Sequence, residues 1–329
     1  MSLYALARLG LSLLLLAVAG CAPVVALPGP AIAAPSIADA ALIAPDGAKL
    51  PLRTWRPEGE KPPRAVVIAL HGFNDYRNFF AAPGAWFAAR GVQAYAYDQR
   101  GFGEAPNRGL WPGERALADD LKAAVHAVRK RHPGTPLFLL GESMGGAVIM
   151  TAMAGPRPPP VDGVILAAPA VWGRASMPWY QTTALWLAVH TLPSGQVTGR
   201  NLGIKPSDNI EMLKALGRDP LVIKQSRIDT VYGLVNLMDR AMISASSLQV
   251  PALVLYGAKD QLIPPAAVRE MTERLPASAD GRRRVAYYSN GYHMLLRDLQ
   301  GETVWRDILA WMSDPAGPLP SGAEEQAAR

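Results

Sequence analysis

The chain has 329 residues, of which half are apolar and 18% are charged, and its formal charge is +6. This composition is typical of a folded protein with a sizeable core, so it excludes a disordered or collagen-like chain. The length is enough for one large α/β domain. The basic residues are scattered apart from short runs at 129–131 and 282–284, with no aromatic residues interleaved, so we expect no nucleic-acid partner.

The first predicted element is an apolar run over 9–20 that follows Arg8. It is too short to span a bilayer comfortably but is typical of the core of a signal peptide. The run ends in Val-Ala-Gly-Cys at 18–21, which resembles the lipobox of bacterial lipoproteins, and Cys21 is the only cysteine of the chain. We therefore predict a lipoprotein signal peptide over 1–21 with lipidation of Cys21. The alternative is an ordinary cleaved signal with a chance cysteine.

The two ends of the exported chain are predicted to lie outside the folded domain. Residues 22–40 are rich in Ala and Pro without any period, which predicts a flexible tether, and 314–329 is predicted to be a disordered tail. The residue that follows the lipobox cysteine is Ala22 rather than Asp, and by resemblance this favours an outer-membrane anchor that faces the periplasm. The membrane is thus an expected partner through the lipid.

Between these ends, short apolar runs alternate with longer amphipathic stretches. Strands are predicted at 65–70, 92–97, 137–140, 164–168, 252–256 and 285–288, after an opening hairpin over 41–56. Helices are predicted at 116–131, 144–154, 266–275 and 303–312. This alternation predicts an α/β fold, with a mostly parallel twisted sheet and helices on both faces.

One segment interrupts the alternation. No buried-strand run occurs over 172–247, which instead holds helix-like pieces rich in aromatic residues. We predict a helical cap there, inserted into a core formed by 41–171 and 248–313. Such insertions lie at the carboxyl edge of the sheet, where functional loops gather.

A serine in a glycine-rich turn is the first candidate for chemistry. The predicted strand 137–140 continues into Gly-Glu-Ser-Met-Gly-Gly at 141–146, and a helix follows. In this strand–turn–helix context G-x-S-x-G projects the serine above the sheet, and the helix N-terminus favours developing negative charge. Ser143 is therefore the predicted nucleophile. The alternative is a glycine-rich turn with an idle serine.

The base that activates a serine is a histidine, and the chain has five. His293 follows the last predicted strand and precedes a helix, where this type of fold delivers its base, so we predict it as the base. His126 and His132 lie in or just after an amphipathic helix, and His190 lies in the predicted cap. His71 follows the first long strand, where it is more readily explained as a residue that shapes a loop.

The acid that orients the base should lie at the tip of a strand between Ser143 and His293. Strand 164–168 is followed by no carboxylate, whereas 252–256 is followed by Gly-Ala-Lys-Asp, which ends in Asp260. We predict that Asp260 holds the imidazole in the required tautomer, and the order Ser, Asp, His is the one expected of this fold.

Other roles for these carboxylates stay open. Asp260 could instead cap a helix, because Pro264 and Pro265 follow closely. Asp98 is the main competitor for the role of acid, although it precedes the serine and is more readily explained as organising its loop. Asp298 lies five residues after the histidine, at a helix start.

Two backbone N–H groups are needed to stabilise an oxyanion. One is expected from Met144, directly after the nucleophile, and the other from Phe73, in the loop after the first long strand. Because these are backbone roles, the identity of the side chains carries little information.

Together these motifs resemble the monoacylglycerol lipase and lysophospholipase group of α/β-hydrolases, often labelled serine aminopeptidase S33. The resemblance covers about 42–313 and rests on His-Gly-Phe at 71–73, Asp-Gln-Arg-Gly-Phe-Gly at 98–103, the elbow at 141–146, Gly-Ala-Lys-Asp at 257–260 and Gly-Tyr-His at 291–293. It implies a helical cap, hydrolysis of esters of glycerol or glycerophospholipids, no metal and no organic cofactor. Gln99 stands where relatives often carry His.

We therefore predict a serine carboxylester hydrolase for monoacylglycerol-like or lysophospholipid-like esters. The alternatives are a hydrolase of small esters, thioesters or peptide amides with the same triad, or a non-catalytic lipid-binding lipoprotein on the same scaffold. Dehalogenase and epoxide hydrolase chemistries are disfavoured because they place a carboxylate at the elbow. Trp179 and Trp186 share one face of a predicted cap helix, which fits either packing of the cap on the core or an acyl groove or membrane-facing lid. None of these patterns indicates an oligomeric state.

Overall fold

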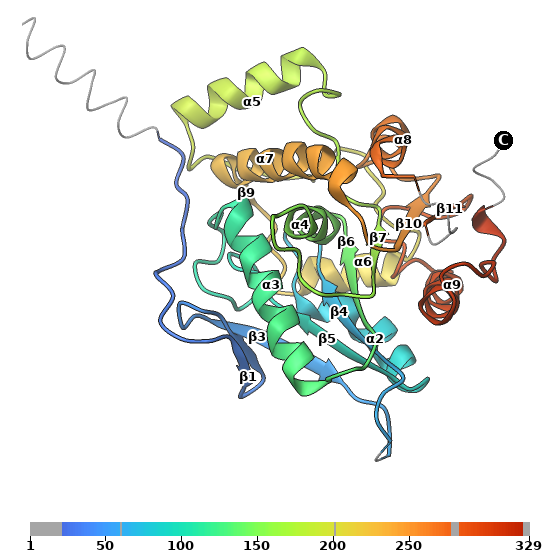
Figure 1. Cartoon of the computed structure of the whole chain (residues 1–329). Coiled ribbons are helices and arrows are strands. Elements are labelled where there is room, and N and C mark those ends of the chain that lie inside the picture. The colour runs from blue at the N-terminus through green and yellow to red at the C-terminus, as the bar shows by residue number, and fades with distance from the viewer. Residues whose placement is uncertain (1–21, 60, 201, 278–282, 325–329) are drawn as a thin grey trace, which may run out of the picture.

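The computed structural model describes residues 22–59, 61–200, 202–277 and 283–324. Its centre is a nine-stranded sheet in the order β1-β2-β3-β5-β4-β6-β7-β10-β11 (Figure 1). The strands are β1 (Ser36–Ala38), β2 (Ala41–Ile43), β3 (Lys49–Trp55), β4 (Ala65–Leu70), β5 (Val92–Tyr97), β6 (Leu137–Glu142), β7 (Gly163–Ala167), β10 (Ala252–Gly257) and β11 (Arg283–Tyr288). Neighbouring strands are parallel from β5 through β4, β6, β7 and β10 to β11. Neighbouring strands are antiparallel from β1 through β2 and β3 to β5. The predicted mostly parallel sheet is confirmed.

The central strands are continuous apolar runs because both of their faces are covered. Every residue of β4, β5, β6, β7 and β10 is buried. Each predicted strand and helix occurs within two residues of its predicted bounds. β6 runs two residues further than predicted, because Gly141 and Glu142 still pair with Leu166 and Ala167 of β7. The strand therefore delivers the chain directly to Ser143.

Helices cover the two faces in separate groups. α3 (Glu114–Arg131), α4 (Met144–Met153) and α8 (Pro265–Arg274) bury their apolar residues on one side of the sheet, and α7 (Ile228–Ser244) adds its buried residues to the same cluster by packing on α4. α2 (Ala81–Ala88) and α9 (Gly301–Ser313) pack on the other. α2, with the short 3₁₀ helix η1 (Arg77–Phe80) before it, has no predicted counterpart, because its almost uniformly apolar sequence shows no helical period. Within the described ranges, no helix combines the length and the apolar character needed to cross a bilayer.

In the described residues between β7 and β10, the chain forms three α-helices and a two-stranded ribbon. They are α5 (Trp179–Thr191), α6 (Ile210–Arg218), α7, β8 (Gln196–Val197) and β9 (Ser226–Arg227), followed by the 3₁₀ helix η2 (Ala245–Ser247). α7 packs on α4, and α5 packs on α7 as the outermost layer (Figure 1). α7 is therefore part of the core, whereas α5 lies furthest from the sheet.

The described parts of both chain ends lie against the domain, which differs from the tether and tail predicted for 22–40 and 314–329. The Ala26 N–H donates to the Trp111 carbonyl at 2.8 Å, and the Val24 N–H donates to Asp229 Oδ2 of α7 at 3.2 Å. An extended segment can pair its backbone without any side-chain period, so the sequence pattern does not report such pairing. At the other end Glu324 pairs with Arg284 at 2.8 Å. The predicted signal peptide, Cys21 included, lies outside the described residues.

Candidate active site

The turn that carries Ser143 has a strained backbone conformation, which the surrounding contacts must stabilise. Ser143 has φ +52° and ψ −114°, a region that non-glycine residues rarely adopt. A Cβ on Gly141 would lie 2.4 Å from the backbone of Gly145, and one on Gly145 would lie 2.3 Å from the Leu70 carbonyl oxygen. Gly141 is therefore required for β6 and α4 to meet at this angle, and Gly145 is required for α4 to pass close to the end of β4. The Ser143 N–H donates to the Ala167 carbonyl at 2.9 Å, which ties the turn to β7.

Asp260 and His293 form a buried pair at the ends of β10 and β11. His293 Nδ1 lies 2.7 Å from Asp260 Oδ2, and the two residues are 6% and 8% exposed. Asp260 Oδ1 accepts hydrogen bonds from the N–H groups of Leu262 at 2.7 Å and Ile263 at 3.1 Å. Because a carboxylate can only accept, Nδ1 carries the proton and Nε2 presents its lone pair. The pair thus has the geometry of a base and the acid that orients it.

Ser143 and His293 line the same cavity, which has a volume of about 260 Å³. Among the described residues, no hydrogen bond joins the Ser143 hydroxyl to the His293 imidazole. Such hydrogen bonds are often long in a free enzyme and tighten when substrate binds. The structure therefore brings the three residues to one site while leaving the serine unengaged.

The two predicted oxyanion donors flank the serine. A Cβ on Gly72 would lie 3.4 Å from Ser143 Cβ, so the loop that carries Phe73 passes directly beside the nucleophile. Phe73 also lines the cavity. Met144 is the first residue of α4, so its N–H has no acceptor within the helix. Both residues therefore lie next to Ser143, and their role as oxyanion donors stays a prediction.

His71 and Gln99 hold the loop that precedes Phe73. His71 Nδ1 donates to the Gly72 carbonyl at 2.8 Å, and His71 Nε2 accepts from the Gln99 N–H at 3.0 Å. The Gln99 amide donates to the His71 carbonyl at 2.9 Å. These two hydrogen bonds require a neutral imidazole, and burial lowers the pKa of His71, which favours this form. His71 therefore shapes the loop, and Gln99 supports it.

The competing carboxylates have structural partners. Asp98 accepts from the Arg77 N–H and the Glu104 N–H, both at 2.8 Å, and organises the η1 turn. Asp298 accepts from Ser207 Oγ at 2.6 Å and from the Tyr292 N–H at 2.7 Å. Neither makes the contact with the imidazole that Asp260 makes. Among the described residues, no group of histidine, cysteine and carboxylate side chains could hold a metal ion.

An ion-paired group in the cavity has no counterpart among the predicted site residues. Asp75, Glu142 and Arg297 all line the cavity, and the Arg297 guanidinium lies 2.8 Å from Asp75 and 2.7 Å from Glu142. The sequence shows that two of them lie near Ser143 and His293 along the chain. Nothing in the sequence indicates that they meet.

The rest of the cavity wall is mainly apolar. It is formed by Ala170, Trp172, Leu234, Met238, Leu262, Ile263 and Met294. Trp179 and Trp186 are not part of it and do not pack on the core, because they are 77% and 53% exposed. Both the packing interpretation and the acyl-groove interpretation of these two tryptophans are therefore wrong. The two tryptophans instead form part of an exposed apolar surface on α5.

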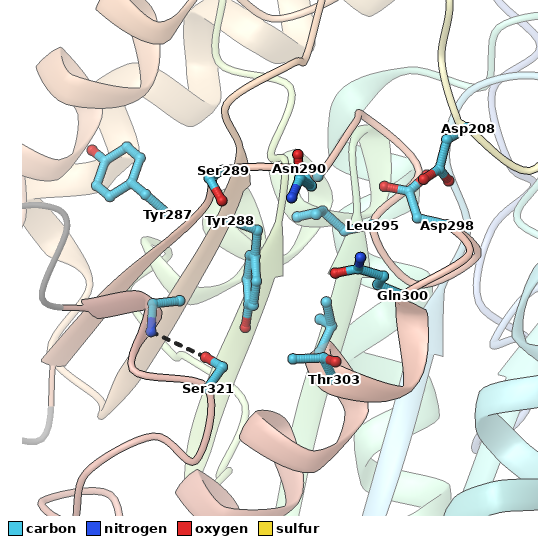
Figure 2. A pocket seen from close by; sticks show the side chains of 13 residues that line it. Asp208, Tyr287, Tyr288, Ser289, Asn290, Leu295, Asp298, Gln300, Thr303 and Ser321 are labelled. Atoms are coloured by element: carbon cyan, nitrogen blue, oxygen red, sulfur yellow. Dashed lines mark hydrogen bonds between the residues drawn. The ribbon is translucent and has the colours of Figure 1, made fainter.

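A second cavity lies behind the His293 loop, between β11, α9 and the segment around Ser321 (Figure 2). It has a volume of about 150 Å³ and is lined mainly by polar residues, among them Asp208, Asn290 and Asp298. It contains neither Ser143 nor His293. The chemistry is therefore placed in the first cavity.

A serine at a strained strand–helix turn, a histidine held by a buried carboxylate and a parallel sheet beneath them define a serine hydrolase of the α/β-hydrolase class. The chain belongs to the family described as serine aminopeptidase, S33, whose model matches residues 61–300.

Among its relatives, the monoacylglycerol lipase of Mycolicibacterium smegmatis is 26% identical over 278 residues, which cover 81% of this chain and 93% of that protein. The human monoglyceride lipase is 28% identical over 289 residues, which cover 83% and 89%.

Solved structures confirm the fold. The crystal structure of the Paleococcus ferrophilus monoacylglycerol lipase superposes with a TM-score of 0.67 at 22% identity, covering 81% of this chain and 99% of that one. A soluble variant of the Saccharomyces cerevisiae monoglyceride lipase, solved with a substrate analogue, gives a TM-score of 0.69 at 20% identity and covers 90% and 99%. The predicted α/β-hydrolase fold is confirmed.

Proposed function

We propose that this protein hydrolyses monoacylglycerol-like or lysophospholipid-like esters through an acyl-enzyme on Ser143. The observation that carries the proposal is the shared cavity, in which Ser143 and the Asp260-held His293 lie beside a mainly apolar wall. An acyl chain gains free energy by leaving water for such a wall. The lipases named among the relatives act on substrates of this kind, which supports the assignment.

The reaction follows the double-displacement scheme of serine hydrolases. His293 Nε2 accepts the proton of the Ser143 hydroxyl as the oxygen attacks the ester carbonyl. The N–H groups of Phe73 and Met144 donate to the oxyanion. His293 then returns the proton to the alcohol, which leaves, and a water molecule repeats the sequence to release the fatty acid. Asp260 stays ionised and stabilises the imidazolium throughout.

The test compares the full chain, purified in a mild detergent, with its Ser143→Ala variant on p-nitrophenyl and glycerol monoesters of increasing acyl length. We expect hydrolysis by the unaltered protein, a preference for medium or long chains, and no activity in the variant. Activity confined to short chains would move the function to small esters. Inactivity on every ester would favour a thioester or amide substrate, or the lipid carrier.

A fluorophosphonate probe separates the carrier from the enzymes, because it reacts only with an activated serine. We expect Ser143 to be labelled and the label to be lost in Ser143→Ala. An unlabelled protein would contradict every hydrolase assignment. A labelled protein with no activity on esters would keep the hydrolase and exclude the ester substrate.

We also propose that the protein is a lipoprotein anchored through Cys21, with α5 facing the bilayer. α5 exposes Trp179, Tyr180, Trp186 and Leu187, and a cluster of exposed aromatic residues is typical of a membrane-facing surface. The segment after the anchor leads to this region, since Val24 is hydrogen-bonded to the first turn of α7.

Labelled fatty acid should be incorporated into the protein in cells, and Cys21→Ala should abolish the incorporation. Unchanged incorporation would contradict the assignment of the anchor.

A further inference from the structure

Three segments that are far apart in the chain meet at the guanidinium of Arg297. Its Nη1 lies 2.8 Å from Asp75 Oδ2, and its Nη2 lies 2.7 Å from Glu142 Oε2. The side chains of the three residues are 9%, 7% and 2% exposed. Arg297 itself follows His293 by four residues, so one side chain connects the histidine loop to two other segments of the active site.

Each carboxylate belongs to a segment with one of the proposed oxyanion donors. Asp75 closes the turn that contains Phe73, because its N–H donates to the Gly72 carbonyl at 3.3 Å and its Oδ1 accepts from the Tyr76 N–H at 2.8 Å. Glu142 is the last residue of β6, directly before Ser143 and the Met144 N–H. The distance between the two carboxylates is therefore coupled to the distance between the two donors.

An arginine suits this position better than any other cation. Its planar guanidinium presents several N–H donors in a fixed arrangement, so it can hold two carboxylates at a set spacing, whereas a lysine ammonium acts as a single flexible charge. Burial raises the pKa of Glu142, and Arg297 counteracts this rise by stabilising the carboxylate. Arg297 is itself held at both ends, because its guanidinium lies over the Phe79 ring and its backbone carbonyl accepts from the Asn209 amide at 3.0 Å.

We infer that Arg297 is a positioning residue that sets the spacing of the two oxyanion donors, Phe73 and Met144, relative to Ser143. The inference rests on the proposed function, because it needs an oxyanion to form at that site. An oxyanion exists only in and near the transition state, so a misplaced donor lowers kcat and leaves KM nearly unchanged.

The test measures kcat, KM and the melting temperature for Arg297→Lys and Arg297→Gln in the full chain. Removal of one oxyanion donor costs about a hundredfold to a thousandfold in kcat, so a displaced donor should cost about tenfold or more in the Lys variant and more in the Gln variant. We expect KM to stay within about twofold in both variants. The partial recovery in Lys relative to Gln reports the charge that the conservative variant keeps.

The matched control is Arg100→Lys. Arg100 also bridges two carboxylates, with Nε 2.6 Å from Asp120 and Nη2 2.7 Å from Asp46, and its side chain is 8% exposed, but it does not line the cavity. We expect Arg100→Lys to lower the melting temperature about as much as Arg297→Lys does, while kcat stays unchanged. The comparison separates the loss of a buried ion pair from the loss of donor positioning.

Three outcomes would overturn the inference. If kcat falls in Arg297→Lys by no more than in Arg100→Lys, Arg297 is merely structural. If KM rises while kcat is kept, Arg297 contacts the substrate instead. If the unaltered protein neither hydrolyses esters nor reacts with the fluorophosphonate, the proposed function fails and the inference fails with it, whereas an active unaltered protein confines the failure to the role of Arg297.

Discussion

The Asp260→Asn substitution changes one atom of the buried pair and leaves its shape intact. In the structure Asp260 Oδ1 accepts two backbone N–H groups, from Leu262 and Ile263, while Oδ2 faces His293 Nδ1 at 2.7 Å. An amide has one accepting oxygen and one donating nitrogen. The two N–H donors require the oxygen at the Oδ1 position, so the amide nitrogen must face Nδ1. The imidazole then has to accept at Nδ1 and carry its proton on Nε2.

An imidazole with its proton on Nε2 cannot accept the proton of Ser143. We expect kcat for p-nitrophenyl esters to fall by about 10⁴-fold, the usual effect of the wrong tautomer in a serine triad, which corresponds to about 5 kcal/mol in the activation barrier. The melting temperature should change little, because every hydrogen bond of the pair keeps a partner.

The control is Asp98→Asn, which alters an equally buried carboxylate without contact to the imidazole. Asp98 accepts from Arg77 and from the Glu104 N–H, so its substitution should lower the melting temperature and keep kcat within about tenfold of the unaltered value. If Asp260→Asn retained more than about 1% of kcat, or if Asp98→Asn were the more damaging of the two, the assignment of Asp260 as the acid would be refuted.

Further predictions follow from the elbow, the His71 loop and α5. Ser143→Gly should unfold at a higher temperature than Ser143→Ala, because glycine relieves the backbone strain at φ +52°. That relief is worth about 1–3 kcal/mol and exceeds the cost of the greater entropy of an unfolded glycine, about 0.4–1 kcal/mol. Equal melting temperatures would show that this φ carries no strain. Because the pKa of His71 is lowered in the folded protein, the unfolded chain binds more protons than the folded protein below about pH 6.5. The free energy of unfolding should therefore fall as the pH drops from neutral, by at most about 1.4 kcal/mol per pH unit for this histidine. Urea titrations at several pH values should show that His71→Gln removes this contribution of His71 to the pH dependence. The double variant Trp179→Ser with Trp186→Ser should bind lipid vesicles more weakly in a flotation assay while its activity on short soluble esters is kept, and unchanged flotation would exclude α5 as the membrane-facing surface.

Sequence patterns predicted the parts of this fold that are governed by local rules. The buried strands are continuous apolar runs, and the Ser143 turn has a short motif with a steric cause, so both could be located before the structure was known. The pairing of Asp260 with His293 followed from their places at two strand ends, because parallel strands bring their carboxyl ends to one edge of the sheet.

Features that depend on contacts between distant segments could not be predicted in this way. In the sequence, Arg297 is an unremarked arginine between His293 and the last predicted helix, and its role becomes visible only when β6 and the Gly72 loop are placed around it. The exposure of Trp186 depends on which face of α5 packs on α7, and a helix whose apolar and polar residues are not segregated to separate faces gives no such information.

The hydrogen bonds of Val24 and Ala26 have a consequence for how the enzyme would meet its substrate. Because the chain is hydrogen-bonded to the domain from Val24 onward, a lipid on Cys21 would be separated from the folded domain by only two residues, a span of at most about 11 Å of extended chain. A long flexible linker would let the enzyme tumble and capture substrate from any direction. If Cys21 carries a lipid, so short a linker would instead restrict the orientations that the enzyme can adopt above the bilayer, and the fold would determine which orientation it takes. Substrate would then reach the active site only through the part of the protein surface that this orientation turns toward the bilayer.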